Sequence, residues 1–201
     1  MKLYFDKRIR LAVNLTAGLF LACLMQVSAT AAPWPTKPIK IIVPFSPGSV
    51  QDALARSFSN ELGVALGETV LVENKAGAGG TVGTSIVAKS APDGYTLVMA
   101  AASHNINGTL FPKLSFDPIK DFTAGAYIGT SSYVMMTNSE FPAKTVGEFI
   151  ALAKAKPGQY NYASAGNGSA SHLAMAYFDS MAGIDLVHIP TKGTGDAITE
   201  L

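Results

Sequence analysis

Four short segments rich in glycine, serine, threonine and asparagine hold most of the residues that could bind a ligand. They span residues 46–49, 76–84, 164–171 and 191–195, each between a strand-like and a helix-like stretch. Small residues let backbone N–H groups approach a ligand, and a helix N-terminus adds unpaired donors and a positive dipole end. One such turn can be glycine-rich merely because it is tight. Four turns at the carboxyl edge of a parallel sheet predict an anion site built from amides and hydroxyls.

Nucleotide binding is the first alternative for the segment 76–84. The dinucleotide pattern G-x-G-x-x-G, started at Gly77, requires glycine at position 82, where the sequence has Val82. No G-K-[ST] follows, so the segment is not a P-loop either. We therefore predict no nucleotide cofactor.

Hydrolysis is the second alternative, because serines are plentiful and the chain has His104, His172 and His188. No serine lies in a G-x-S-x-G elbow, and the histidines lack metal-ligand spacing. His188, between two apolar residues, is expected to be structural, whereas His104 and His172 could point into a cleft. We predict no catalytic residue, metal or cofactor; a secreted α/β hydrolase or oxidoreductase stays open as the alternative.

The N-terminus is typical of a secretory signal at residues 1–31. Four basic residues precede an apolar run, and Ala29-Thr30-Ala31 offers a cleavage site. Cys23, the only cysteine, lies inside this signal, so we expect a mature protein without thiols. Cleavage would remove four of 15 basic and one of 14 acidic residues, leaving a net charge of −2. No basic field for nucleic acid remains.

The mature sequence begins with a β-α-β-α-β pattern, typical of a parallel sheet. Strands are predicted at 39–43, 70–73 and 95–100, and helices from Val50 to near Gly67 and over 84–90. Ser49 and Asp52 form a capping pair for the first helix.

The second half repeats strand-turn-helix units after a loop-rich stretch at 103–120. We predict a capping box at Thr145 and Glu148 and a helix that places Val146, Phe149, Ile150 and Ala153 on one face. Further predictions are an extended segment at 122–128, strands at 133–137, 159–163 and 186–189, a helix through Leu173 and Met181, and a helix beginning near Gly195.

Several motifs resemble one known family, in order along the mature chain. They are residues 34–45 (WPTKPIKIIVPF), 72–80 (VENKAGAGG), 91–97 (APDGYTL), 116–122 (FDPIKDF) and 161–169 (NYASAGNGS). Together they are similar to Bug-type receptors, the periplasmic solute-binding proteins of tripartite tricarboxylate transporters.

The resemblance implies an α/β, two-lobed periplasmic binding protein (type II-like) that closes on a small carboxylate and delivers it to membrane subunits. It implies a non-enzymatic, monomeric, periplasmic protein with no nucleic-acid partner. Lobe 1 would span 32–126 and an incomplete lobe 2 would span 127–201. The implied ligand-binding residues are Pro47, Gly48, Ser49, Ala78, Gly79, Thr81, Ser103, Ser131, Ser164, Gly168, Ser169 and His172.

The sequence departs from the family at two site positions and in length. Ser49 stands where a second glycine is common, and Thr191 stands where tyrosine is common. Family members run about a hundred residues further. We therefore expect the chain to be truncated, and expect the 201-residue product to fold poorly and bind weakly unless it is extended past Leu201.

Overall fold

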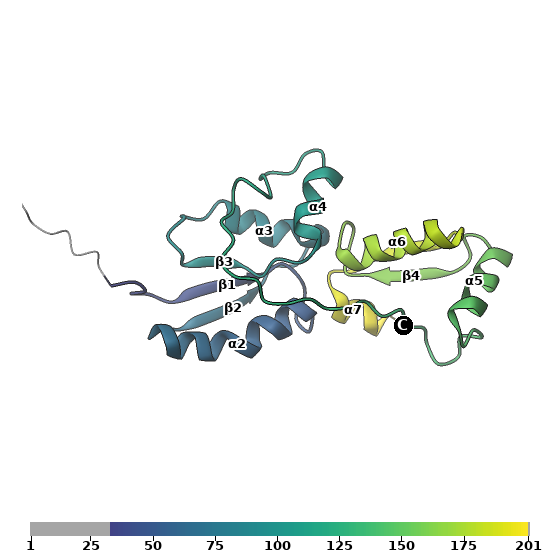
Figure 1. Ribbon diagram of the computed structural model, residues 1–201, viewed down its shortest axis with the longest axis horizontal. Helices are drawn as coiled ribbons and strands as arrows, with labels where there is room; N and C mark the ends of the chain where they lie inside the picture. The colour runs from purple at the N-terminus through teal and green to yellow at the C-terminus, as the bar shows by residue number, and fades with distance from the viewer. Residues whose placement is uncertain (1–32, 201) are drawn as a thin grey trace, which may run out of the picture. The chain divides into compact units, whose positions relative to one another are not determined.

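The computed structural model describes residues 33–200, and all of its helices and strands lie within Pro35–Leu201 (Figure 1). The predicted signal at 1–31 and its Cys23 lie outside the described residues. Within residues 33–200, no helix is long and apolar enough to cross a membrane.

The first sheet consists of three parallel strands in the order β2-β1-β3. These are β1 (Ile39–Val43), β2 (Val70–Asn74) and β3 (Thr96–Val98). The central strand β1 carries the core, because its isoleucines and Val43 are buried, together with Phe45 just beyond its end. The predicted β-α-β-α-β unit is therefore confirmed, although β3 is shorter than expected.

Helix α2 (Val50–Leu66) packs against β1 and β2, and α3 (Thr81–Ala88) packs against β1 and β3 (Figure 1). The predicted cap of α2 is confirmed, since the Ser49 hydroxyl accepts a hydrogen bond from the Asp52 amide at 3.3 Å. Gly67 ends the helix with a φ of 72°, a left-handed conformation that favours glycine.

Two predictions in this half were wrong. The second helix begins at Thr81 instead of residue 84, after a 3₁₀ turn η1 (Ala78–Gly80). The stretch 103–120, predicted as loop-rich, contains helix α4 (Ser103–Leu110). Neither α3 nor α4 has a side-chain cap at its start, so the usual sequence signal is absent. Burial of Ser103 and Asn107 against the rest of the protein holds α4 in place instead.

The second sheet pairs β4 (Asn161–Ser164) with β5 (Val187–Pro190) in parallel. Its helices are α5 (Val146–Ala155), α6 (Ala170–Ala182) and α7 (Thr194–Thr199). The capping box of α5 is confirmed, and Phe149 and Ala153 enter the core as predicted. Val146, at the first position of α5, is 52% exposed and does not.

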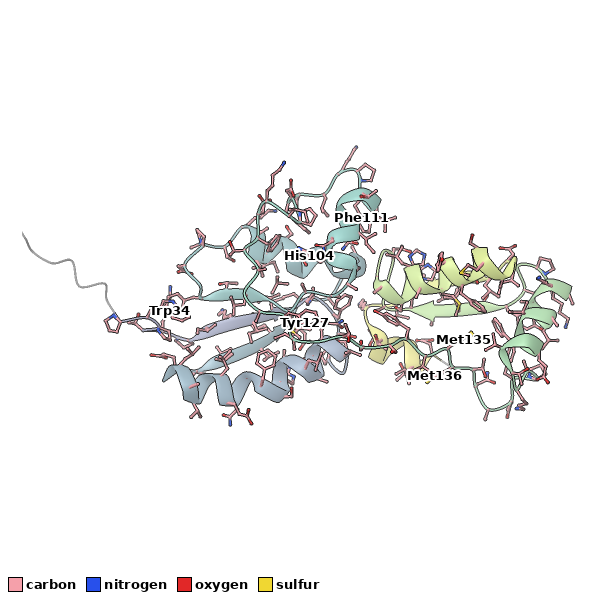
Figure 2. All side chains as sticks on the ribbon, in the orientation of Figure 1. Trp34, His104, Phe111, Tyr127, Met135 and Met136 are labelled. Carbon is pink, nitrogen blue, oxygen red and sulfur yellow. The ribbon has the colours of Figure 1, made fainter. Side chains whose placement is uncertain are left out.

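The prediction of a strand at 133–137 was wrong, because the segment 122–138 contains no helix or strand. Most of its apolar side chains, including Tyr127, Met135 and Met136 (labelled in Figure 2), are exposed. A strand is stable only when its backbone is hydrogen-bonded to a neighbour, and no described strand pairs with this segment. The α/β class with parallel sheets is confirmed, and the boundary between lobes at 126/127 stays a prediction.

Candidate functional site

The four glycine-rich turns that were singled out in the sequence meet in the structure. The Ser46 amide donates to the Lys192 carbonyl oxygen at 3.3 Å, which joins the first turn to the fourth. Gly79, in the second turn, lies so close to the third that a methyl group there would overlap the Asn167 carbonyl oxygen. The Thr191 hydroxyl lies 2.7 Å from the Ser164 carbonyl oxygen, which links the fourth turn to the third. The predicted convergence of polar turns at strand ends is therefore present.

A small cavity lies beside this cluster, with a volume of about 10 Å³. That is roughly the space required by one water molecule. The predicted residues Gly79 and Ser103 line it, together with Gly80 and Thr84 of the second turn and with His104. The remaining lining residues, which the sequence did not single out as ligand-binding, are Pro44, Phe45, Ala101 and Asn107. A carboxylate needs more room, so this arrangement must open to admit one.

Asn107 is the clearest of these additional residues. It is buried on α4, and its amide nitrogen, oriented to suit its neighbours, lies 3.3 Å from the carbonyl oxygens of both Ser103 and Gly168. It therefore bridges its own helix to the third turn. An asparagine in a polar sequence stretch gives no signal of such a contact.

Every backbone N–H group of turn 46–49 already donates a hydrogen bond within the protein. Ser46 donates to Lys192, Gly48 donates to the Asp52 carboxylate at 3.0 Å, and Ser49 donates to the Ser46 carbonyl oxygen at 3.2 Å. Pro47 has no N–H. The predicted amide donors of this turn therefore serve the protein's own acceptors in this conformation.

Asp52 explains why. It is 5% exposed, and its carboxylate accepts hydrogen bonds from Gly48, from Asn74 Nδ2 at 2.9 Å and from Arg56 Nε at 2.9 Å. Burial alone would raise the pKa of Asp52, but these donors and the Arg56 charge outweigh burial and hold the pKa below its ordinary value. Asn74 also donates to the Phe45 carbonyl oxygen at 3.1 Å, so the network fixes both sides of the turn.

The second turn has two backbone donors that lack an acceptor in the part of the chain that the structure describes, the amides of Ala78 and Gly79. Ala78 and Gly79 begin η1, where backbone amides lack intrahelical partners, and both have positive φ angles of 45° and 62°. Gly79 must be glycine because of the overlap with Asn167. The Thr81 hydroxyl donates to the Ala78 carbonyl oxygen at 3.0 Å and stabilises the turn.

The third turn leads into α6, whose cap is Ser169; its hydroxyl accepts from the His172 amide at 3.3 Å. The amides of Ala170 and Ser171, at the first two positions of α6, point away from the helix body and lack intrahelical acceptors. Gly168 donates its amide to His172 Nδ1 at 3.1 Å. Ser164, Gly168, Ser169 and His172 are therefore brought together as predicted.

His172 stacks on His188, with ring centroids 4.0 Å apart. His188 Nε2 lies 2.6 Å from the Ser164 hydroxyl, so the histidine expected to be structural supports a predicted site residue. Burial lowers the pKa of both histidines, and for His188 the neighbouring His172 lowers it further. Both rings are therefore neutral near pH 7.

Two residues predicted to face a cleft form no hydrogen bond with the four turns among the described residues. Ser131 is exposed in segment 122–138, and no hydrogen bond joins it to a described residue of the four turns. His104, labelled in Figure 2, lines the small cavity. Its Nε2 lies 2.8 Å from the Pro118 carbonyl oxygen, and its ring packs against Phe116 and Phe122. Its role here is to hold the chain after α4.

The site therefore offers amides, hydroxyls and neutral imidazoles. Within residues 33–200, no group of three His, Cys, Asp or Glu side chains could hold a metal ion. Such a donor set suits an anion that is bound by hydrogen bonds.

Known proteins are similar to this chain in sequence and in fold. Residues 54–201 match the model of the tripartite tricarboxylate transporter family receptor. Protein BugT of Bordetella pertussis is 35% identical over 187 residues, which cover 92% of this chain and 57% of BugT.

Two solved structures are similar as well, each with a TM-score of 0.72. The periplasmic binding protein BugD is 32% identical, over 84% of this chain and 56% of that one. MatC from Rhodopseudomonas palustris with bound malate is 31% identical, over 84% of this chain and 57% of that one. The chain thus spans a little over half the length of these relatives. Because the family model matches most of its residues, the chain belongs to the tripartite tricarboxylate transporter receptors.

Proposed function

We propose that this protein is an extracytoplasmic receptor that captures a small carboxylate for a tripartite tricarboxylate-type transporter. The observation that carries the proposal is the meeting of four polar turns at the ends of parallel strands. Donors at η1 and at the start of α6 remain available there for an anion. The relative MatC, whose structure contains malate, has the same fold.

Local donors must select the ligand, because the chain carries little net charge. The formal charge is +1 for the whole sequence and −2 after the proposed signal is removed. Neither value attracts anions over a distance. Mono- and dicarboxylates with several acceptor oxygens fit the donors best.

The proposed ligand-binding set remains that of the sequence prediction: Pro47, Gly48, Ser49, Ala78, Gly79, Thr81, Ser103, Ser131, Ser164, Gly168, Ser169 and His172. The proposal also includes lobes at 32–126 and 127–201, a periplasmic location after signal cleavage, membrane subunits as partners and a monomeric state. The family and the periplasmic relative BugD support the location and the transport role.

The competing function is hydrolysis, and the Ser164–His188 pair is the observation that favours it. Ser164 is only 1% exposed, and its hydroxyl also accepts the Gly166 amide at 3.1 Å. A nucleophile must reach its substrate, so this serine is better suited to shaping the turn.

The test is a thermal-shift screen of the purified protein with malate, succinate, glucose and spermidine. A ligand that binds only the folded state raises the melting temperature. We expect a rise with the carboxylates alone. Stabilisation only by the sugar or the amine would refute a carboxylate receptor. Turnover of a carboxylic ester or acid, abolished by His172→Ala, would show an enzyme instead.

A further inference from the structure

Ser46 has a buried hydroxyl that nothing in the fold uses. The residue is 6% exposed, and its Oγ has no hydrogen-bond partner among residues 33–200. A buried hydroxyl without a partner costs free energy, so its presence calls for an explanation. In the part of the chain that the structure describes, only one other buried side-chain atom, Asp179 Oδ1, is in the same state.

The position of Ser46 places this hydroxyl within the candidate site. Ser46 opens turn 46–49 just after β1, and its hydroxyl faces Gly193 so closely that a methyl group at Gly193 would overlap it. A 3.3 Å hydrogen bond from the Ser46 amide to the Lys192 carbonyl oxygen, long for an N–H···O bond, joins the two turns, and Gly195 also lies close to the Pro47 carbonyl oxygen. The fourth turn therefore covers the Ser46 hydroxyl with Gly193 and is joined to the first turn by one weak backbone hydrogen bond and by close packing.

The backbone donors of this turn are already taken, because the amides of Gly48 and Ser49 donate to Asp52 and to Ser46. The Ser49 hydroxyl is committed as the acceptor of the Asp52 amide, which caps α2. Resting on the proposed function, we infer that Ser46 is a ligand-contacting residue, whose hydroxyl donates to a carboxylate oxygen when the 191–195 turn moves aside. A bound carboxylate then accepts a hydrogen bond from the hydroxyl, which has no partner among residues 33–200.

Ser46→Ala tests this inference because it should weaken malate binding without lowering the stability of the fold. Loss of a hydrogen bond to a charged acceptor should weaken malate binding about tenfold or more in isothermal titration calorimetry. Removal of an unsatisfied hydroxyl should leave the urea midpoint unchanged or raise it. The matched control is Ser57→Ala on α2, whose exposed hydroxyl donates to Leu54; its malate affinity should equal that of the wild type.

Three results would overturn the inference, and each is recognisable. Equal malate affinity of Ser46→Ala and wild type shows that the hydroxyl does not touch the ligand. A clearly lower urea midpoint shows that it has a structural partner. If the wild type binds none of the carboxylates in the screen, the proposed function itself fails, and the Ser46 inference fails with it.

Discussion

At the scale of single residues, the ability of the site to bind an anion depends on which hydrogen-bond donors are already bonded to the protein's own acceptors. Asp52 brings a carboxylate to the start of α2, where a helix would otherwise offer its amides to an external anion. Whereas Asp52 is charged, His172 and His188 are held neutral beside the third turn. Both effects depend on side chains that reach back to a turn from a neighbouring element.

The paired histidines predict a loss of stability in mild acid. Burial holds the pKa of both below 6.5, the value in the unfolded chain, so the unfolded state binds more protons as the pH falls below 6.5. Their stabilising contribution is complete above that pH and is lost as pH falls through the folded values. The melting temperature, followed by circular dichroism, should fall as the pH is lowered below about 6.5.

His188→Gln is the control for this pH dependence. A glutamine amide can still bond to the Ser164 hydroxyl, but it does not titrate. The variant should show a smaller fall over the same range. A fall as large as that of the wild type would mean that the stacked histidines are not its cause.

The hydrogen bonds of Asn74 lead to a prediction about stability. Asn74→Ala removes the bonds to Asp52 and Phe45 and leaves buried acceptors without that donor. We expect a loss of about 1–3 kcal/mol in the free energy of unfolding. Urea denaturation measures it, with Glu73→Gln on the same strand as the control, since the ion pair of Glu73 with Lys40 is partly exposed and worth little. Equal midpoints for the two variants would contradict the network.

At the scale of helices and strands, local capping explains much of what the sequence could predict. The starts of α2, α5 and α6 carry Ser49, Thr145 and Ser169 as caps, and all three helices were predicted. The starts of α3 and α4 have no side-chain cap, and they were misplaced or missed, whereas α7 was predicted from its glycine-rich turn although it has no such cap either. Caps are local signals, whereas burial of α4 is not visible along the sequence.

The same division holds for the site. The turns could be predicted because their composition is local, and their meeting followed from parallel topology. The commitment of the Gly48 amide to Asp52, the open Ser46 hydroxyl and the Asn107 bridge could not, because each depends on side-chain geometry across elements. Ser131 was placed by resemblance alone, and the structure leaves it exposed.

The capping box gives a prediction at this scale. Thr145→Ala removes the acceptor of the Glu148 amide at 3.2 Å and should cost about 1 kcal/mol of stability. Thr123→Ala, at an exposed position outside any helix or strand, should change it by less than about 0.5 kcal/mol. Chemical denaturation of both variants measures the difference, and no difference would mean that the cap does not stabilise α5.

At the scale of the whole molecule, the exposed apolar segment 122–138 stands out. Tyr127, Tyr133, Val134 and Met136 are all more than half exposed, so burying them is not what stabilises the described fold. Contiguous exposed apolar side chains promote association. The segment is therefore expected to limit solubility more than stability.

Val134→Ser tests that expectation. Because Val134 is 79% exposed, the free energy of unfolding should change by less than about 0.5 kcal/mol, while the concentration at which the protein aggregates should rise. Urea denaturation and light scattering measure the two effects. A large loss of stability would show that Val134 is buried in solution.

The central claim is that the meeting turns bind a carboxylate through its charge and acceptor oxygens. The most direct measurement compares malate with its neutral diamide, malamide, by isothermal titration calorimetry on the purified protein. The two ligands have nearly the same shape, but amide nitrogens cannot accept hydrogen bonds from backbone N–H groups. We predict saturable binding of malate and binding of malamide at least about tenfold weaker, a difference of about 1.4 kcal/mol. Equal binding of the two, or tighter binding of malamide, would contradict the account.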